Sequence, residues 1–317
     1  MDTPVLDTPI RLGTRASPLA LWQAETTRES LRRAWAQSGI DPAPPITIIE
    51  VTTQGDRVRD RPLADLGGKG LFTKDIDQAL LDGAIDIAVH SLKDVPSLLP
   101  DALTIAGVLP RADPRDVWIA ADGAGLADLA PGSVVGTCSP RRQAQVLMAR
   151  PDLCVAPLRG NVGTRLRRLA EGAFAATLLA RAGLDRLGLT PPDGVVMEPE
   201  TMLPAVGQGA IALVCRSGDA RSTALAAGPC CATTFTQITA ERAMLRALGG
   251  SCHTPIAGLA SVDGDRLTLH GLVALPDGSR HVRHAVTGLA GDAARLGESL
   301  GAALRRDAGD LLAAMGL

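Results

Sequence analysis

The sequence predicts an α/β protein with two similar lobes and a small α+β domain at its C-terminal end. Three observations favour this fold class. Short apolar stretches alternate with longer helical stretches up to about residue 215, the same strand-to-helix turn occurs at 13–18 and at 136–140, and paired strands replace the alternation from about residue 229. At 317 residues the chain is also too long for one typical hydrophobic core.

The composition is that of an ordinary globular enzyme and disfavours other classes of protein. Aromatic residues make up 2% of the chain and the net charge is −2, which argues against a nucleic-acid binder because such proteins use aromatic stacking and basic patches. No apolar run approaches the roughly 20 residues that span a membrane, and the acidic first eight residues do not resemble a signal peptide. The cysteines lack disulfide-like spacing, and the histidines lack metal-ligand spacing with them. We therefore expect a cytoplasmic protein with no metal, no membrane partner and no nucleic-acid partner.

The first lobe is predicted to begin with a strand at 10–12 and a helix that Ser17 and Pro18 open. Serine is a strong N-cap, and proline suits the first helical position. The helix should end at Gly39 and bury one apolar stripe: Leu19, Trp22, Leu31 and Trp35. The remaining elements expected in this lobe are strands at 46–51 and 85–89 and a helix through Leu80.

The second lobe repeats this arrangement. A strand at 134–135 leads into a helix that Ser139 and Pro140 open, and the next elements are a strand at 155–158, a helix at 161–171 and a strand at 175–179. A strand that feeds a helix N-terminus through a small polar turn is suited to bind an anion. Two such turns predict two lobes around a common cleft, as in periplasmic-binding-protein folds; coincidence is the alternative, since the turn is common.

The rest of the chain predicts a hinge and a separate domain. The segment 203–209 has the proline and glycine content of a hinge, and the strand at 211–215 is expected to return to the first lobe. A helix at 237–248, two hairpin turns at 263–264 and 276–278, and a helix at 292–315 predict an α+β domain. The predicted division is 1–109 with 208–228, then 110–207, then 229–317.

Arginines concentrate in the second lobe. Residues 141–186 contain nine arginines and three acidic residues, a local charge of 9 − 3 = +6. Arginine pairs bidentately with carboxylates, so this pattern predicts a cleft for a small molecule with several carboxylates. We expect four of the arginines to bind ligand: Arg141, Arg142, Arg159 and Arg165. A solvated helix face is the better interpretation of Arg167 and Arg168.

Lys93 and Asp94 follow the predicted strand at 85–89. Open α/β sheets bind ligands beyond the carboxyl ends of their strands. A carboxylate there can stabilise a developing cation and manage a proton. The alternative is that the Lys93–Asp94 pair only caps a turn. Cys252, which follows two glycines and Ser251, is either an exposed reactive thiol or a buried inert one.

Seven stretches of the sequence resemble the porphobilinogen deaminase (hydroxymethylbilane synthase) family. They occur in the family's order: 13–24, 67–72, 88–96, 136–143, 158–165, 203–210, and 240–243 followed by Cys252. The resemblance implies a three-domain, monomeric transferase that joins four porphobilinogen molecules into the linear tetrapyrrole hydroxymethylbilane with release of ammonia. It also implies a place in porphyrin and heme biosynthesis, with the product passed to a uroporphyrinogen-forming enzyme.

The resemblance further implies a cofactor and a set of site residues. A dipyrromethane would be joined through a thioether to Cys252 and serve as the primer, and Asp94 would be the catalytic carboxylate. Substrate and cofactor would be held by Arg15, Ser17, Lys69, Phe72, Lys93, Thr137, Ser139, Arg141, Arg142, Arg159, Gly160, Arg165, Arg186 and Gln208. Lys69 and Phe72 would lie on a loop over the cleft, and Gln208 at the hinge.

The sequence departs from the family pattern at a few positions. Cys138 and Pro140 stand where serine and leucine are expected, Asp65 replaces a second loop lysine, and His253 follows the cofactor cysteine. None of these removes a proposed catalytic group. The main alternative function is a non-enzymatic two-lobed protein that binds a small polycarboxylate. An acyl- or phosphoryl-transfer enzyme is disfavoured because the sequence has no phosphate-binding loop.

Overall fold

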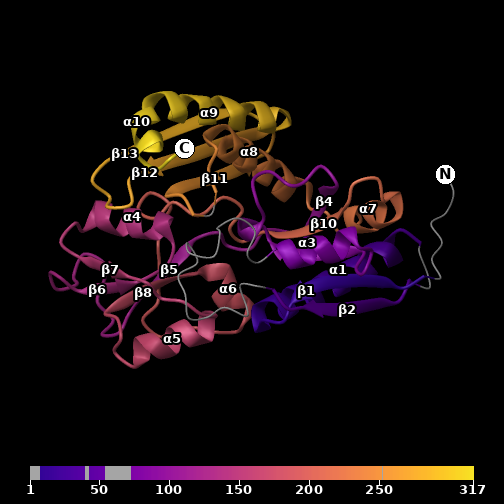
Figure 1. Cartoon of the computed structure of the whole chain (residues 1–317), viewed down its shortest axis with the longest axis horizontal. Helices are drawn as coiled ribbons and strands as arrows, with labels where there is room; N and C mark the ends of the chain where they lie inside the picture. The colour runs from indigo at the N-terminus through magenta and orange to yellow at the C-terminus, as the bar shows by residue number, and fades with distance from the viewer. Residues whose placement is uncertain (1–7, 40–42, 54–72, 252) are drawn as a thin grey trace. The chain divides into compact units, whose positions relative to one another are not determined.

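A computed structural model describes residues 8–39, 43–53, 73–251 and 253–317 (Figure 1). Contacts divide the chain into two compact units, one of Met1–Arg111 with Ala210–Phe235 and the other of Ala112–Gly209 with Thr236–Leu317. Each unit contains a five-stranded mixed sheet, and the second unit also contains a three-stranded antiparallel sheet. The fold is therefore mixed α/β, as the sequence predicts, while the division into three domains stays a prediction.

The first unit is built on a sheet in the order β2-β1-β3-β10-β4. Its strands are β1 (Ile10–Arg15), β2 (Ile46–Val51), β3 (Ile87–Ser91), β4 (Leu103–Val108) and β10 (Ile211–Arg216). Its helices are α1 (Pro18–Gln37), α3 (Lys74–Leu81) and α7 (Ala220–Ala227). The strands β1, β2 and β3 are parallel, and β10 lies antiparallel between β3 and β4. The predicted return of the chain to the first lobe at residue 211 is confirmed.

Helix α1 begins where its sequence predicts. The Ser17 side chain accepts a hydrogen bond from the Ala20 N–H, and Pro18 is the first helical residue. The predicted apolar stripe is only half right, because Leu31 and Trp35 are buried whereas Trp22 is 38% exposed. The buried face near the N-terminus instead carries polar Gln23 among others, because this end of the helix faces the strand ends that form the candidate site.

The second unit repeats the topology of the first. Its larger sheet has the order β7-β6-β8-β5-β9. The first three strands are parallel, β5 is antiparallel to β8, and β9 is antiparallel to β5, which matches β2-β1-β3-β10-β4 position by position. The strands are β5 (Asp116–Ala120), β6 (Val134–Gly136), β7 (Cys154–Ala156), β8 (Ala176–Ala180) and β9 (Val195–Val196). The helices are α4 (Pro140–Ala149), α5 (Val162–Ala170) and α6 (Arg181–Arg186). This shared topology confirms the two similar lobes that the repeated turn predicts.

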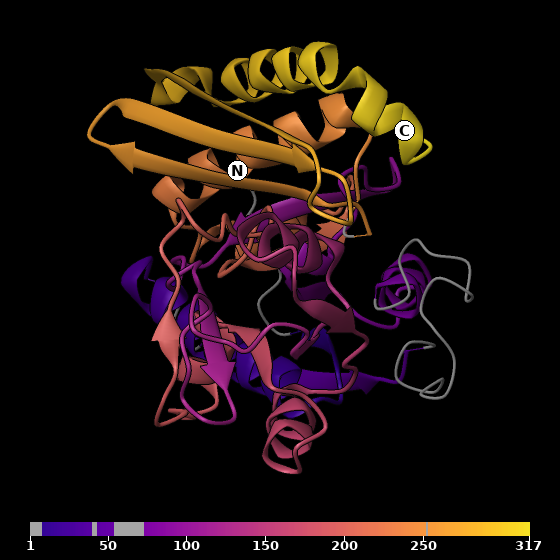
Figure 2. The ribbon, with the colours of Figure 1, turned by 90° about the vertical axis from the view of Figure 1, so that its left-hand side faces the viewer.

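The C-terminal part forms hairpins beside two long helices (Figure 2). Its elements are α8 (Ala232–Leu248), β11 (Ile256–Asp263), β12 (Arg266–Ala274), β13 (His281–Leu289), α9 (Ala293–Asp307) and α10 (Gly309–Ala314). Residues of α8 and α9, among them Met244 and Leu300, form one hydrophobic core with the sheet. The prediction of a single helix over 292–315 is wrong, because the helix ends at Asp307 and Gly309, a poor helix former, begins a new one.

No helix in the described part of the chain is long and apolar enough to cross a membrane.

Candidate active site

The first unit contains a pocket at the carboxyl ends of β1 and β3. It has a volume of about 100 Å³, and four of the predicted site residues line it: Arg15, Ser17, Lys93 and Asp94. Arg15 ends β1, Ser17 caps α1, and Lys93 and Asp94 belong to a 3-10 turn, Leu92–Asp94, that follows β3 directly. This is the position at which open α/β sheets bind ligands. The structure thus brings a carboxylate and two cations together, while their roles stay predictions.

The pocket is braced by hydrogen bonds that the sequence did not predict. Gln23 of α1 donates to the hydroxyl of Ser91 at 2.8 Å, and both side chains line the pocket. The backbone N–H of Leu92 donates to the carbonyl of Ala210 at 3.0 Å, at the start of β10. The turn that carries Asp94 is therefore fastened to a helix on one side and to the returning strand on the other. The sequence feature that could have indicated this hydrogen bond is polar Gln23 on the buried face of a helix.

His90 lies at the base of this pocket and is almost fully buried. Burial lowers its pKa to about 4, and the positive charge of Arg15 acts in the same direction. The imidazole is therefore neutral at physiological pH and leaves the positive charge of the pocket to Arg15 and Lys93.

In the second unit, Ser139 and Pro140 open a helix as predicted, and anion binding by this turn stays a prediction. The N–H of Ser139 donates to the hydroxyl of Thr137 at 3.1 Å, and the Ser139 hydroxyl accepts from the N–H of Arg142 at the start of α4. Pro140 departs from the family pattern but occupies the first turn of the helix, where proline fits. Cys138 is exposed beside it. The departures at 138 and 140 therefore leave the helix start intact.

Arg141 and Arg142 are buried, and both pair with one carboxylate that the sequence did not single out. Arg141 Nη1 lies 2.7 Å from Asp116 Oδ2, and Arg142 Nη2 lies 2.7 Å from Asp116 Oδ1. Gln208 Nε2 also donates to Asp116 Oδ1, at 2.9 Å. Asp116 is fully buried at the start of β5, and the two guanidinium groups hold its pKa well below the ordinary value although burial opposes them. The sequence feature that could have singled out Asp116 is its position directly before the apolar run 117–120.

The three acids of the arginine-rich stretch 141–186 pair with arginines outside this cluster. Arg150 pairs with Asp152, Arg167 with Glu171, and Arg181 with Asp185, at 2.6, 3.5 and 2.7 Å. Arg167 and Glu171 are both more than half exposed, which confirms the solvated helix face predicted for Arg167. These three acids therefore do not pair with Arg141 or Arg142, whose carboxylate partner among the described residues is Asp116.

Two of the three remaining predicted arginines donate hydrogen bonds to glycine carbonyls. Arg165 donates to the carbonyl of Gly160 at 2.8 Å, and Arg186 donates to the carbonyl of Gly209 at 2.6 Å. Both glycines have positive φ, +114° and +87°, which other residues rarely adopt. Burial lowers the pKa of Arg186 to about 10, so it remains charged at neutral pH. Arg159, between β7 and α5, is half-buried.

Three predicted site residues lie outside the described residues: Lys69, Phe72 and Cys252. Their roles remain those that the family resemblance implies. Within the described ranges no group of three or more histidine, cysteine, aspartate or glutamate side chains could hold a metal ion.

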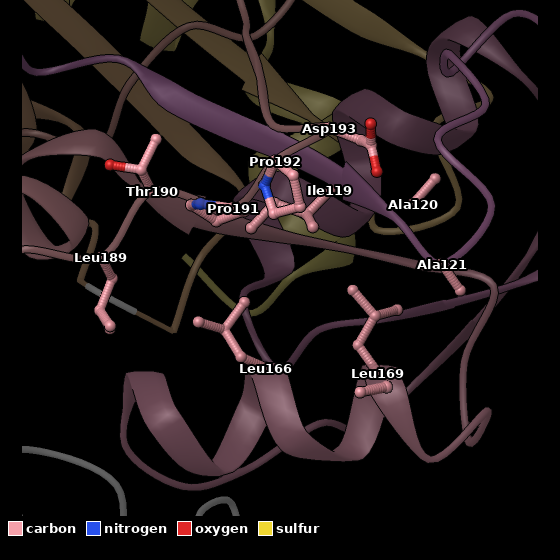
Figure 3. A pocket seen from close by; sticks show the side chains of 11 residues that line it. Ile119, Ala120, Ala121, Leu166, Leu169, Leu189, Thr190, Pro191, Pro192 and Asp193 are labelled. Atoms are coloured by element: carbon pink, nitrogen blue, oxygen red, sulfur yellow. The ribbon is translucent and has the colours of Figure 1, made fainter.

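A second pocket of about 320 Å³ lies in the second unit and is mostly apolar. Leu166 and Leu169 project from α5 toward Pro191 and Pro192 (Figure 3). Among the described residues that line it, Asp193 is the only charged one. These residues offer no cation to a carboxylate, so we do not assign the pocket to the candidate site.

Comparisons with known proteins agree with the geometry. Residues 10–224 match the family model "Porphobilinogen deaminase, dipyromethane cofactor binding domain", and residues 235–306 match "Porphobilinogen deaminase, C-terminal domain". The chain is 49% identical over 310 residues to the porphobilinogen deaminase of Nitrobacter hamburgensis, covering 98% of this chain and 96% of that protein. It is 48% identical over 297 residues to that of Paracoccus denitrificans, covering 94% of each.

A more distant likeness links the chain to a VFT2 domain of BvgS from Bordetella pertussis. The TM-score is 0.43 at 14% identity, covering 71% of this chain and 87% of that one, which is too weak to carry a conclusion. The family matches span nearly the whole sequence and include the segments that form the pocket of the first unit and the arginine cluster of the second. The chain therefore belongs to the porphobilinogen deaminase family.

Proposed function

We propose that this chain joins four porphobilinogen molecules head to tail into hydroxymethylbilane, with release of ammonia, and that Asp94 is its catalytic carboxylate. The observation that carries the proposal is the pocket in which Asp94 lies with Arg15 and Lys93 at the end of β3. A substrate that bears carboxylates and develops a positive charge as ammonia leaves requires this combination of groups. The relatives named above are called porphobilinogen deaminases, which supports the same substrate.

The described residues fit the dipyrromethane that the family resemblance implies. The cluster of Arg141, Arg142 and Asp116 carries one uncompensated positive charge, and Nε of each arginine is buried with no hydrogen-bond partner among the described residues. Buried unpartnered donors are costly unless a ligand satisfies them. Carboxylates of a dipyrromethane are suitable acceptors. When bound, this group supplies the primer to which pyrroles are added.

Asp94 has two tasks in this mechanism. Its carboxylate accepts a hydrogen bond from the pyrrole N–H of the substrate, which orients the ring, and its negative charge stabilises the cation that forms on the substrate when the carbon–nitrogen bond breaks. The 3-10 turn and the bonds at Leu92 and Ser91 hold the carboxylate in place, so little reorganisation is needed. Arg15 and Lys93 bind the substrate carboxylates, and neutral His90 adds no competing charge.

We further propose that the protein acts as a cytoplasmic monomer whose product passes to a uroporphyrinogen-forming enzyme. An open-chain tetrapyrrole with a reactive hydroxymethyl end must be consumed by an enzyme that closes the ring. The alternative is a binding protein without catalysis, which would not need the Asp94 carboxylate in a pocket that cations line. The relatives of this chain named above are also called deaminases.

The test is the intact mass of the purified protein before and after addition of porphobilinogen. We expect the wild type to carry the mass of two linked pyrroles and Cys252→Ser to lack it. Porphobilinogen should then add one-pyrrole steps to the wild type. Asp94→Asn should remain folded but turn over about 10²–10⁴-fold more slowly, because the charge that stabilises the cation is gone.

The matched control is Asp101→Asn, an exposed aspartate shortly after the same turn, which should behave as wild type. Normal turnover by folded Asp94→Asn would remove Asp94 from the mechanism. A wild type that carries no added mass and gains none with porphobilinogen would overturn the function itself.

A further inference from the structure

The Asp116 carboxylate, buried in the second unit, accepts hydrogen bonds from three different side chains. Its Oδ1 accepts from Arg142 Nη2 and Gln208 Nε2, and its Oδ2 accepts from Arg141 Nη1. Its backbone carbonyl accepts from the Met197 N–H at 2.8 Å, and its strand pairs with β8. The carboxylate is thus fixed to the sheet and meets three donors at 2.7–2.9 Å.

Each arginine is fixed at a second point by a backbone carbonyl. Arg141 Nη1 also donates to the carbonyl of Leu203 at 2.9 Å, and Arg142 Nη1 donates to the carbonyl of Leu178 at 2.8 Å. The hydrogen bonds to Asp116 and to these carbonyls are donated by Nη1 of Arg141 and by Nη1 and Nη2 of Arg142. The Nε of each remains without a partner among the described residues. The hydrogen bonds therefore fix the orientation of both guanidinium groups. The Nε–H of each arginine remains available to donate to a ligand.

The charge of the cluster also requires explanation. Two guanidinium groups face one carboxylate, so burial of all three leaves a net charge of +1 away from water. Burial of an unbalanced charge is unfavourable, and replacement of buried ion pairs by apolar residues is often neutral or stabilising. A cluster that served folding alone would not need a second buried arginine. A site that binds the carboxylate of a ligand would need it, because the ligand's negative charge balances the second guanidinium group.

We propose that Asp116 is a positioning residue: it holds the Arg141 and Arg142 guanidinium groups in the orientation that receives the carboxylates of the dipyrromethane, without touching that group itself. This inference rests on the proposed function. According to this inference, Asp116 helps the two arginines to bind the ligand carboxylates and does not compete with those carboxylates for the arginines. Because Gln208 donates both to Asp116 and to the carbonyl of Pro114, the orientation also depends on the segment 203–209.

The test compares Asp116→Asn with Asp86→Asn. Asp86 is an almost buried carboxylate of the first unit that also faces two arginines, Arg11 at 2.7 Å and Arg216 at 3.6 Å, and it lies in no proposed site. Each variant loses the ion pairs of one carboxylate with two arginines, those of Asp86 being the more exposed, and both should lower the melting temperature. Only Asp116→Asn should lower the ratio of dipyrromethane-loaded to unloaded protein, by about tenfold or more, measured by intact mass of the purified full chain.

Each outcome decides the proposal. A tenfold lower ratio in folded Asp116→Asn, with normal loading of Asp86→Asn, supports it. Unchanged loading would reduce Asp116 to a structural ion pair, and increased loading would show that it competes with the ligand. Either result overturns the proposal. Equal loss of loading in both variants would also overturn it, since reduced stability would then suffice.

If Asp116→Asn does not fold, the variant Gln208→Leu tests the proposal instead. This variant removes one of the three donors to Asp116, together with the bond to the Pro114 carbonyl, and keeps both ion pairs. We expect its loaded ratio to fall about threefold, consistent with the loss of one of the three hydrogen bonds that hold the Asp116 carboxylate. Unchanged loading of the folded variant would contradict the proposal. The wild type measured alongside separates this failure from failure of the proposed function, because only the latter predicts an unloaded wild type.

Discussion

At the scale of single residues, His90 and Asp77 respond to burial in opposite ways. The two side chains lie 3.9 Å apart in the first unit. Burial lowers the pKa of His90 to about 4 and raises the pKa of Asp77 to about 6. In the unfolded chain both groups return to ordinary values of about 6.5 and 3.8. The two therefore contribute to the pH dependence of stability with opposite signs.

The sign for each group follows from linkage. Between pH 6.5 and 4 the unfolded chain binds a proton at residue 90 and the folded chain does not, so His90 removes stability as the pH falls. Between pH 6 and 3.8 the folded chain binds a proton at residue 77 and the unfolded chain does not, so Asp77 adds stability as the pH falls.

We expect substitutions at these two positions to change the pH dependence in opposite directions. In urea unfolding at pH 7.5 and 5.0, His90→Gln should lose less stability on acidification than the wild type, and Asp77→Asn should lose more. The His90 effect is of order 2 kcal/mol over this range. A pH dependence that neither variant alters would show that burial does not perturb these groups.

The candidate site could be predicted only where its residues belong to one local pattern. Arg15 with Ser17 and Lys93 with Asp94 each follow a recognisable strand, so the sequence placed them correctly at strand ends. Asp116 was missed because its partners are 25 and 26 residues away, and a local count of charge cannot show which acid meets which arginine. Burial of polar groups depends on tertiary contacts, which composition does not contain.

At the scale of elements, the predicted strands and helices were most accurate where a cap or a turn marks them. Ser17, Ser139 and the hairpin turns fixed their elements closely. Strands β4 and β5 were missed, because a short apolar run without alternation or turn signals does not distinguish a buried strand from other structure. The return of β10 was predicted because five consecutive apolar residues follow a glycine-rich segment.

Gly209 is a position in the 203–209 segment where a side chain should be poorly tolerated. Its φ is +87°, and an added Cβ would lie 2.4 Å from the carbonyl oxygen of Ala112. We expect Gly209→Ala to lower the free energy of unfolding by about 2–4 kcal/mol, from the unfavourable backbone conformation and the overlap together.

Gly218→Ala is the matched control, because its φ is +86° and nothing lies within 4 Å of the added Cβ. It should cost only about 1–2 kcal/mol. Equal losses in urea unfolding of the two variants would mean that the backbone at Gly209 moves away from Ala112 at little cost.

At the scale of the whole molecule, Glu241 joins three segments that are far apart in the sequence. It is fully buried on α8, and its carboxylate accepts from the N–H of Gly207 at 2.7 Å and from the N–H of Ala260 in β11 at 2.8 Å. The same side chain therefore fastens the predicted hinge segment to the C-terminal hairpins. The sequence showed Glu241 only as part of a family motif, with no indication of these partners.

We expect Glu241→Gln to loosen this junction. The amide presents an N–H₂ to one of two backbone donors, leaving a buried N–H unpaired at a cost of about 1–3 kcal/mol. Hydrogen exchange should accelerate at residues 203–209. Glu198→Gln, an exposed partner of Arg115, should change stability by less than about 0.5 kcal/mol. Unchanged exchange in Glu241→Gln would contradict the role of Glu241 as the fastening residue.

The place of β10 between β3 and β4 also has a consequence for biosynthesis. As the chain leaves the ribosome, the first sheet lacks a central strand until residues 211–216 have emerged, whereas every strand of the second unit's larger sheet has emerged by Val196. The lobe that is encoded second can thus complete its sheet first. Until β10 arrives, β3 and β4 each present an unpaired edge, which is when the nascent protein is most exposed to misassociation.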